Sequence, residues 1–305
     1  MIIIEKTTPL DSDRGVRSFE WAFDSLSIAQ EKSFRAAMDE ADNMAKSGKI
    51  RLAIQKYEEI IARYKMNALP AYGRLGTLLP EGRSRIKLVG QVLPFIESRL
   101  EAAVGNVKNG KFASIYNNYW FYDILYLLAQ SYFLDGQTKK GIVLYELMRR
   151  FADSYGPSTC NQVLAWKYIE IGNYGKAIAR SRSELNEEQP LVELLYAFGL
   201  ASVLKGDEEN GFRALRRAFE IFPLYGKIVS EQPPAKLTRY IEMGKQIESF
   251  GSYSLDHALS FLSLSHKGWS FLWKPDGRFP TAFGEKVFGL FTVGEVMFAQ
   301  DFSER

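Results

Sequence analysis

The sequence of 305 residues predicts an all-α fold, an α-solenoid of stacked helix hairpins. Three observations carry this prediction. Helix-like stretches end on a glycine at four places along the chain. Some of these glycines recur at a nearly constant interval. Small residues also recur at fixed distances before and after each glycine, where the two helices of a hairpin would cross.

The four glycines stand in the stretches "KSGKIRLAIQKY", "LDGQTKKGIVLY", "EIGNYGKAIARS" and "LKGDEENGFRAL". From Gly136 to Gly172 the interval is 36 residues, and from Gly172 to Gly206 it is 34. Glycine reaches the left-handed backbone conformation that ends a helix without a Cβ clash. A period near 34 residues is typical of a repeated helix hairpin. Gly48 and Gly136 are 88 residues apart, which is not a whole number of periods, so an insertion is predicted between them.

Small residues stand at two fixed distances from each glycine. Two antiparallel helices approach closely only where the facing side chains are small, so these positions predict the crossing points of the hairpins. Five residues after the glycines, the chain has Ala53, Gly141, Ala177 and Gly211. Seven residues before them, it has Ala41, Ala129, Ala165 and Gly199.

This pattern resembles the tetratricopeptide repeat (TPR) superfamily. The match is best around Gly206, where Ala218 and Pro223 complete the repeat. The resemblance covers about residues 34–68, 122–189 and 192–225. It implies a superhelix of paired helices and a protein-interaction scaffold, because this fold carries many partners and no fixed chemistry. The unit around Gly172 departs from the pattern at Ser181 and Glu184, so its second helix is expected to pack loosely or to lie under another segment.

The chain is predicted to have three parts. Residues 1–30 form a lead-in or cap, and residues 226–305 form a helical extension that packs on the last repeat. Between them, residues 31–225 form the repeats, with an irregular insertion at about 67–111. Outside the repeats, helices are expected over about 85–104, 112–134, 234–249 and 254–266, and residues 285–300 are expected to form a helix or a strand pair.

The TPR resemblance places the first helix of each pair on a concave surface. Such a groove accepts an apolar or helical peptide. The expected partner-binding residues are Tyr126, Gln130, Phe133, Gln162, Trp166, Tyr196 and Leu200. The inward positions lack the Lys, Arg and Asn that capture a peptide carboxylate in some members. Alternatively, the groove is filled by the insertion or by the C-terminal segment, where Trp269, Phe271 and Trp273 need burial. Both alternatives remain open.

Two other classes of function are weaker alternatives. An enzyme or a small-molecule sensor would place a pocket near His257 or His266, between the repeats and the C-terminal region. A nucleic-acid-associated protein would use Arg83, Arg85, Lys87 and the arginines of 213–217. The net charge of +3 does not favour this, because nucleic-acid binders carry strong basic fields. The stretch "GNVKNGKF" at 105–112 lacks the Ser or Thr that a phosphate-binding loop needs after its lysine.

The remaining expectations concern cofactors, compartment and partners. Cys160 is the single cysteine and the chain has two histidines, so neither a zinc site nor any other cofactor is expected. No signal peptide or membrane span stands out, so the protein is expected in the cytoplasm. We expect a non-catalytic scaffold that binds a protein or peptide and not a membrane, with a homo-oligomer left open.

Overall fold

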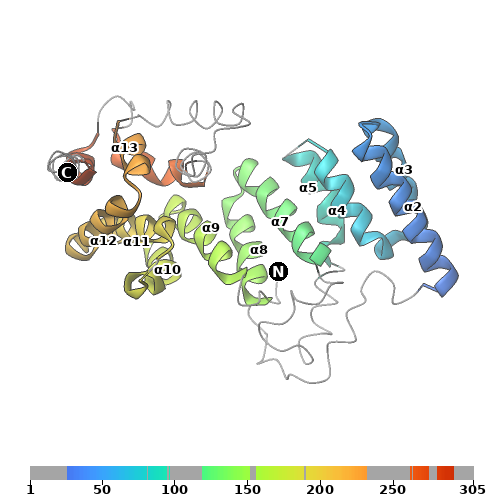
Figure 1. Cartoon of the computed structure of the whole chain (residues 1–305), viewed down its shortest axis with the longest axis horizontal. Coiled ribbons are helices and arrows are strands. Elements are labelled where there is room, and N and C mark those ends of the chain that lie inside the picture. The colour runs from blue at the N-terminus through green and yellow to red at the C-terminus, as the bar shows by residue number, and fades with distance from the viewer. Residues whose placement is uncertain are drawn as a thin grey trace, which may run out of the picture. The chain divides into compact units, whose positions relative to one another are not determined.

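The computed structural model describes residues 26–80, 82–94, 96, 119–151, 156–188, 190–231, 262, 264–274 and 280–291 (Figure 1). Contacts divide the chain into two units, Met1–Cys160 and Asn161–Arg305, and each is described by itself. Within the described residues the regular elements are helices, and only Trp273 and Pro280 form an isolated β-bridge. The all-α, α-solenoid fold class predicted from the sequence is confirmed.

Unit 1 stacks its helices in chain order. It contains α2 (Ile28–Lys46), α3 (Ile50–Tyr64), α4 (Leu69–Leu78), α5 (Arg83–Val89), α7 (Tyr119–Leu134) and α8 (Thr138–Phe151), with short 3-10 turns η1 (Lys65–Ala68) and η2 (Gly90–Val92). Helix α2 packs on α3, and α7 packs on α8, as antiparallel hairpins. Helix α4 packs on both α3 and α7, while α5 also packs on α7. The described part of the expected insertion is therefore a further, shorter hairpin in the stack.

The residues that suggested an irregular insertion have helical roles in α4. Pro70 stands in the first turn of the helix, where its missing N–H has no partner to lose. Gly73 and Gly76 are buried at the contact with neighbouring helices, and a Cβ on Gly76 would lie 3.0 Å from Val89. Helix α4 thus tolerates these residues because Pro70 lies in its first turn, and because Gly73 and Gly76 permit neighbouring helices to pack closely on it.

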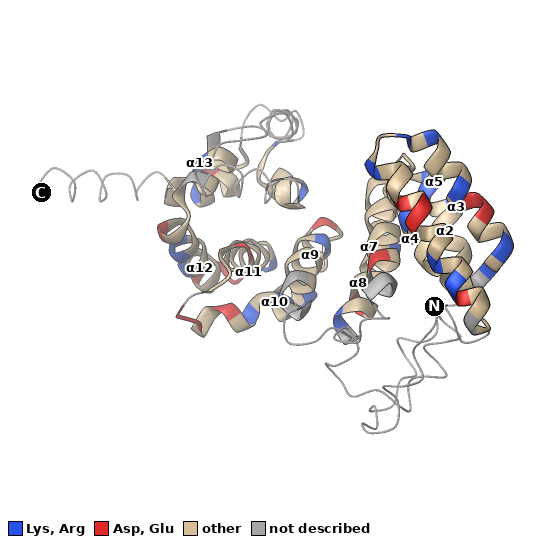
Figure 2. Cartoon of the chain, turned by 45° about the vertical axis from the view of Figure 1, so that its right-hand side comes forward, with Lys and Arg blue, Asp and Glu red and all other residues tan. Residues whose placement is uncertain are grey.

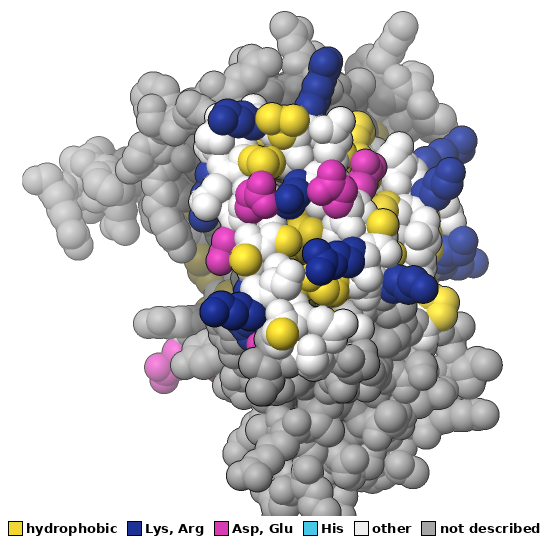
Figure 3. Space-filling model, turned by 90° about the vertical axis from the view of Figure 1, so that its right-hand side faces the viewer, with side chains coloured by type: hydrophobic (Ala, Val, Ile, Leu, Met, Phe, Trp, Pro, Cys, Tyr) yellow, Lys and Arg dark blue, Asp and Glu magenta, His cyan; other side chains and the backbone are white. Residues whose placement is uncertain are grey.

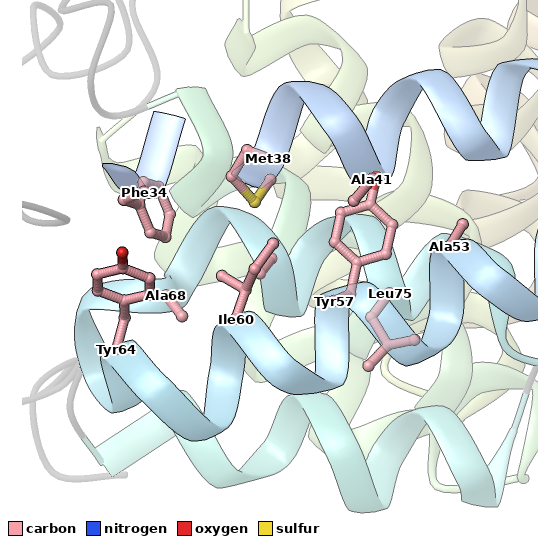
Figure 4. Close-up of a cluster of buried hydrophobic side chains, with 10 residues drawn as sticks. Phe34, Met38, Ala41, Ala53, Tyr57, Ile60, Tyr64, Ala68 and Leu75 are labelled. Atoms are coloured by element: carbon pink, nitrogen blue, oxygen red, sulfur yellow. The ribbon is translucent and has the colours of Figure 1, made fainter. Parts of the chain in front are cut away.

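The core of the first hairpin follows from helical spacing. On α2 and α3 the buried positions recur every three or four residues, which places them on the facing sides of the two helices. The aromatic rings of Phe34 and Tyr64 meet edge to face, 5.1 Å apart. Burial of each large side chain stabilises the fold by about 1.5–3 kcal/mol. The cluster comprises Phe34, Met38, Ala41, Ala53, Tyr57, Ile60, Tyr64, Ala68, Ala71 and Leu75 (Figure 4).

The four aligned glycines end their helices in the same way. Each has a positive φ, between 73° and 99°. At Gly172 the glycine N–H donates to the carbonyl of Ile169, and the next N–H, of Asn173, donates to that of Tyr168. The same two hydrogen bonds recur at Gly48, Gly136 and Gly206. This pair of bonds satisfies the last carbonyls of the helix, so the turn predicted from the sequence repeats four times.

The small residues predicted at the crossing points are buried. Ala41, Ala53, Ala129, Ala165 and Ala177 are inaccessible to solvent. In unit 2 the backbones of α11 (Val192–Lys205) and α12 (Glu208–Ile221) touch, because a Cβ added to Gly211 would lie 2.9 Å from the carbonyl oxygen of Gly199. The prediction that small residues permit the hairpins to close is confirmed.

The stretch "GNYGKAIAR" contains two glycines that should respond oppositely to alanine. Gly172→Ala places a side chain at φ +73° and is expected to lower the free energy of unfolding by about 1 kcal/mol. Gly175→Ala lies inside a helix with open space around the new methyl group, and should raise it by roughly 0.5–1 kcal/mol. Urea unfolding of both variants measures the contrast, and equal effects of the same sign would contradict the turn geometry.

Unit 2 continues the hairpins and adds C-terminal segments. It contains α9 (Gly156–Glu170), which crosses the boundary between the units, α10 (Tyr174–Ser181), η4 (Arg182–Asn186), α11 (Val192–Lys205), α12 (Glu208–Ile221) and α13 (Pro223–Glu231). Residues 264–269 are helical and lead into η5 (Ser270–Leu272), and residues 282–291 form a last helix. Helix α10 packs on α11, which packs on α12, and α12 packs on α13.

The weak second helix predicted around Ser181 is short and lies beside another segment. Helix α10 ends at Ser181, whose hydroxyl donates to the carbonyl of Ala177 at 2.9 Å. The 3-10 turn that follows is held by α12, because Arg217 donates to the carbonyls of Leu185 and Glu187 at 2.7 and 2.5 Å. The segment that departs from the repeat pattern, around Ser181 and Glu184, is therefore stabilised by hydrogen bonds from a later helix, α12.

Other predicted elements are covered only in part. The described residues of 285–300 are helical and belong to the helix over 282–291, so the strand pair is wrong there. The helix expected over 254–266 extends to residue 269 in its described part. The helix expected over 234–249 lies outside the described residues, and so do residues 97–118. The three-part division of the chain stays a prediction.

Candidate partner-binding surface

Three of the expected groove residues in unit 2 are buried. Trp166 on α9 is 1% exposed, while Tyr196 and Leu200 on α11 are inaccessible to solvent. Gln162, also on α9, is half-buried. Whether these residues bind a partner stays a prediction, and such a partner would have to displace whatever covers them.

The C-terminal segment of the chain covers this face of unit 2. The Trp269 ring lies 5.9 Å from Trp166 and 6.0 Å from Tyr196, centroid to centroid, and Phe291 lies 6.1 Å from Tyr196. Gly268 sits directly on Trp166, because a Cβ there would lie 3.0 Å from its ring. The sequence left open whether the groove is accessible to a partner or filled by the chain itself. In unit 2, the C-terminal segment fills it.

Polar contacts hold the same segment in place. Trp269 donates from its indole nitrogen to the hydroxyl of Tyr225, which shares a hydrogen bond with Ser265 at 2.6 Å. At the edge, Lys267 lies 3.3 Å from Glu170 of α9, which also pairs with Lys167 at 2.7 Å. Burial raises the pKa of Tyr225 above its ordinary value, so its hydroxyl stays protonated.

Unit 1 presents its expected groove residues differently. Phe133 on α7 is buried and stacks on Tyr145 of α8 at 5.7 Å. A Cβ on Gly141 would meet the Phe133 ring at 2.3 Å, so this ring fills the space above the glycine. Phe133 therefore holds the hairpin together, and only Tyr126 and Gln130 of the unit 1 set reach solvent.

Helix α7 leaves one line of side chains accessible. Asp123, Tyr126, Gln130 and Leu134 follow one another at intervals of three and four residues, so they lie on one side of the helix. Tyr126 is 50% exposed and Leu134 61%, whereas Asp123 and Gln130 are half-buried. We call these four residues the α7 stripe. Most of the other described side chains of α7 are buried.

The α7 stripe rests on a rigid base. Gln130 donates from Nε2 to the hydroxyl of Tyr145 at 2.8 Å, which leaves its carbonyl oxygen available. The Tyr126 ring meets the Tyr145 ring edge to face at 6.5 Å. Burial raises the pKa of Tyr145 above its ordinary range, which keeps this hydroxyl neutral. Two of the four side chains are thus positioned by one buried tyrosine.

Charges from earlier hairpins lie beside the stripe. Asp123 is the only charged residue of α7, which Figure 2 draws mostly in tan. Burial raises the pKa of Asp123, and the positive charge of Arg74 on α4 partly opposes this. Arg74 lies 3.8 Å from Asp42 of α2, and Asp42 also accepts a hydrogen bond from Tyr57. Acidic, basic and acidic side chains therefore come from three successive hairpins.

Sequence reasoning identified part of this surface. Tyr126 and Gln130 were expected, but Arg74, Asp123 and Leu134 were not. Asp123 and Leu134 share the helical face of Tyr126 and Gln130, so their spacing alone was a usable signal. Arg74 gave no such signal, because its stretch carries the prolines and glycines that indicated an irregular insertion.

The basic residues considered for nucleic-acid binding are largely engaged within the chain. Arg83 pairs with Asp135 at 3.1 Å, and Arg85 is buried with a hydrogen bond to the carbonyl of Leu79. Arg213 pairs with Glu209 at 2.9 Å, while Arg217 holds η4. On the face over α2 and α3, charges of both signs are interspersed with single hydrophobic side chains (Figure 3). No observation here favours nucleic acid.

The residues considered for catalysis also have structural surroundings. His257 lies outside the described residues, and His266 donates from Nδ1 to the carbonyl of Leu262 at 3.0 Å. Burial raises the pKa of the Cys160 thiol to about 11, so it is protonated at neutral pH. In the described ranges no group of three or more His, Cys, Asp or Glu side chains is arranged to hold a metal ion.

A membrane span is also not observed. Among the helices that the structure describes, none combines the length and apolar character needed to cross a bilayer.

Comparison with known proteins does not identify a family for this chain. No family model and no curated protein matches the sequence. Among solved structures, the chain is similar to YrrB, described as a TPR protein with an unusual peptide-binding site. The two are 14% identical, the match covers 61% of this chain and 85% of that one, and the TM-score is 0.43. A similarity at this level leaves the function to be argued from the residues of this chain.

Proposed function

We propose that this protein is a non-catalytic scaffold that binds a protein or peptide on the α7 stripe of unit 1. One observation carries the proposal. Tyr126 is half exposed, its hydroxyl makes no hydrogen bond to any residue that the structure describes, and its ring is held by Tyr145. A rigid aromatic side chain with a free polar end is the residue type that most often anchors a protein interface.

The neighbours of Tyr126 supply the rest of a small interface. Leu134 offers an exposed aliphatic surface at one end of the stripe, and Asp123 offers a carboxylate at the other. The carbonyl oxygen of Gln130, between them, can accept a hydrogen bond from a backbone N–H of the partner, because the hydrogen bond to Tyr145 uses only the amide nitrogen. One helix face therefore combines apolar contact with polar groups that fix orientation.

Removal of the tyrosine ring should weaken binding strongly without unfolding the protein. Tyr126→Ala is expected to lower partner affinity at least tenfold, because a central aromatic anchor contributes about 2 kcal/mol or more. A photo-crosslinking phenylalanine analogue at position 126 of the full chain keeps an aromatic ring at this position, and quantitative mass spectrometry of its adducts identifies the partner. Titration of the purified partner against the wild type and Tyr126→Ala then measures the loss.

Leu52→Ala is the matched control for this experiment. Leu52 is also 50% exposed and belongs to the same unit, but it lies on α3. The Leu52→Ala variant should leave crosslinking at position 126 and the measured affinity for the partner unchanged. Equal losses from the two variants, or no specific adduct at position 126, would count against the α7 stripe as the binding surface.

A further inference from the structure

We propose that the partner presents a lysine or arginine side chain to Asp123, next to an apolar residue that packs on Tyr126. This inference rests on the proposed function and specifies the chemistry of its ligand. It is carried by an unpaired carboxylate, by the charges around it, and by its distance from the exposed ring.

Asp123 has no hydrogen-bond or ion-pair partner among the residues that the structure describes, although the charge of Arg74 acts on it. Its side chain is nevertheless half-buried in the packing of α7, so it has lost part of its hydration. A carboxylate in this position is costly for the free protein. A cation from a partner would form a charge-assisted hydrogen bond there and recover that cost.

The surrounding charges select a cation over an anion. The positive charge of Arg74 acts on Asp123, but Arg74 already lies 3.8 Å from Asp42. One positive charge therefore serves two carboxylates, and the three side chains carry a net charge of −1. An acidic group that approached Arg74 would also approach both carboxylates, and like charges at such distances are unfavourable.

The helix geometry sets the spacing of the two ligand groups. Asp123 and Tyr126 are three residues apart, which is about 4.5 Å along the helix axis at 1.5 Å per residue. A peptide meets both when its basic and apolar side chains stand on one side of its backbone with a similar separation. Residues i and i+2 of an extended segment, or i and i+3 of a helix, satisfy this condition.

The test uses a random dodecapeptide library displayed on phage and selected against the full chain. Peptides that also bind Tyr126→Ala are removed by counter-selection. The enriched sequences are expected to share a Lys or Arg beside a Leu, Ile, Phe or Tyr at one fixed spacing. Enrichment of Tyr126-dependent sequences without a basic position would overturn the cation proposal and leave the proposed function standing.

The selected peptide and its Arg→Gln or Lys→Gln form are then titrated against the wild type and Asp123→Asn. The basic peptide should lose about tenfold in affinity on either change, and little more when both are combined, because the two groups act as one pair. Asp39→Asn removes an exposed carboxylate of α2 and should change nothing. If Asp123→Asn weakens both peptides equally, Asp123 does not contact the cation. If no peptide depends on Tyr126, the proposed function fails too.

A stability measurement separates this role from a structural one. Asp123→Asn should raise the melting temperature at pH 7 by about 1–3 °C, because it removes a partly desolvated charge. The raised pKa means that the folded protein binds this proton more tightly than the unfolded chain does. The advantage of asparagine should therefore shrink as the pH falls through that raised pKa. A lower melting temperature would show that the carboxylate supports the fold and would overturn the proposal.

Discussion

Trp269→Ala is expected to lower the free energy of unfolding of unit 2 by about 4 kcal/mol, in the range measured for large buried aromatic residues. Trp269 is inaccessible to solvent and contacts Trp166, Tyr196, Tyr225 and Phe291 through its ring. Its loss leaves a cavity and removes the indole hydrogen bond to Tyr225. Urea unfolding followed by circular dichroism measures the change.

The effect should be confined to the face that the C-terminal segment covers. Hydrogen exchange in the variant should rise along α9 and α11, because the side chains beneath Trp269 become accessible to water. Helices α2 and α3 of unit 1 should keep their wild-type protection. Uniform loss of protection throughout the chain would show that the segment does more than cover this face.

Phe271→Ala is the control for Trp269→Ala. Phe271 stands two residues away in η5 but is 42% exposed. It should change the unfolding free energy by roughly 0.5 kcal/mol or less, as expected for a surface position. Similar losses from both variants would mean that the packing of Trp269 on Trp166 is not what holds the segment.

Gly211→Ala is expected to destabilise unit 2 by about 2 kcal/mol. The new methyl carbon would lie 2.3 Å from Val203 and 2.9 Å from the carbonyl oxygen of Gly199, so α11 and α12 must move apart. Such overpacking costs about 3 kcal/mol, and the better helix propensity of alanine returns about 1 kcal/mol. Thermal and urea unfolding measure the net change.

Gly175→Ala makes the same chemical change where nothing lies within 4 Å. It should stabilise the protein by roughly 0.5–1 kcal/mol, so the two glycine variants should differ in sign. If Gly211→Ala were neutral, the close approach of α11 and α12 would not depend on the missing Cβ. The explanation of the repeat by small residues would then fail in the hairpin that matches the TPR pattern best.

The part of the surface that sequence predicted is the part that helical spacing encodes. Tyr126 and Gln130 were expected in the groove because the TPR resemblance maps inward positions onto the first helix of each hairpin, where the two residues stand four apart. Arg74 was not predicted, since its place beside Asp42 depends on α4 forming a hairpin between α3 and α7. That packing arises from contacts distant in sequence, and the local prolines and glycines indicated a loop.

The sequence by itself determined where the helices turn and where they cross. The turn glycines need a left-handed backbone, and the crossing residues need small side chains, so both are fixed by local chemistry. Only the tertiary structure decided which faces remain accessible. Tyr126 and Tyr196 each stand ten residues before a turn glycine, yet one is 50% exposed and the other 0%. The difference is made by Trp269 and Phe291, because burial depends on whichever distant segment packs on a face and not on the repeat position.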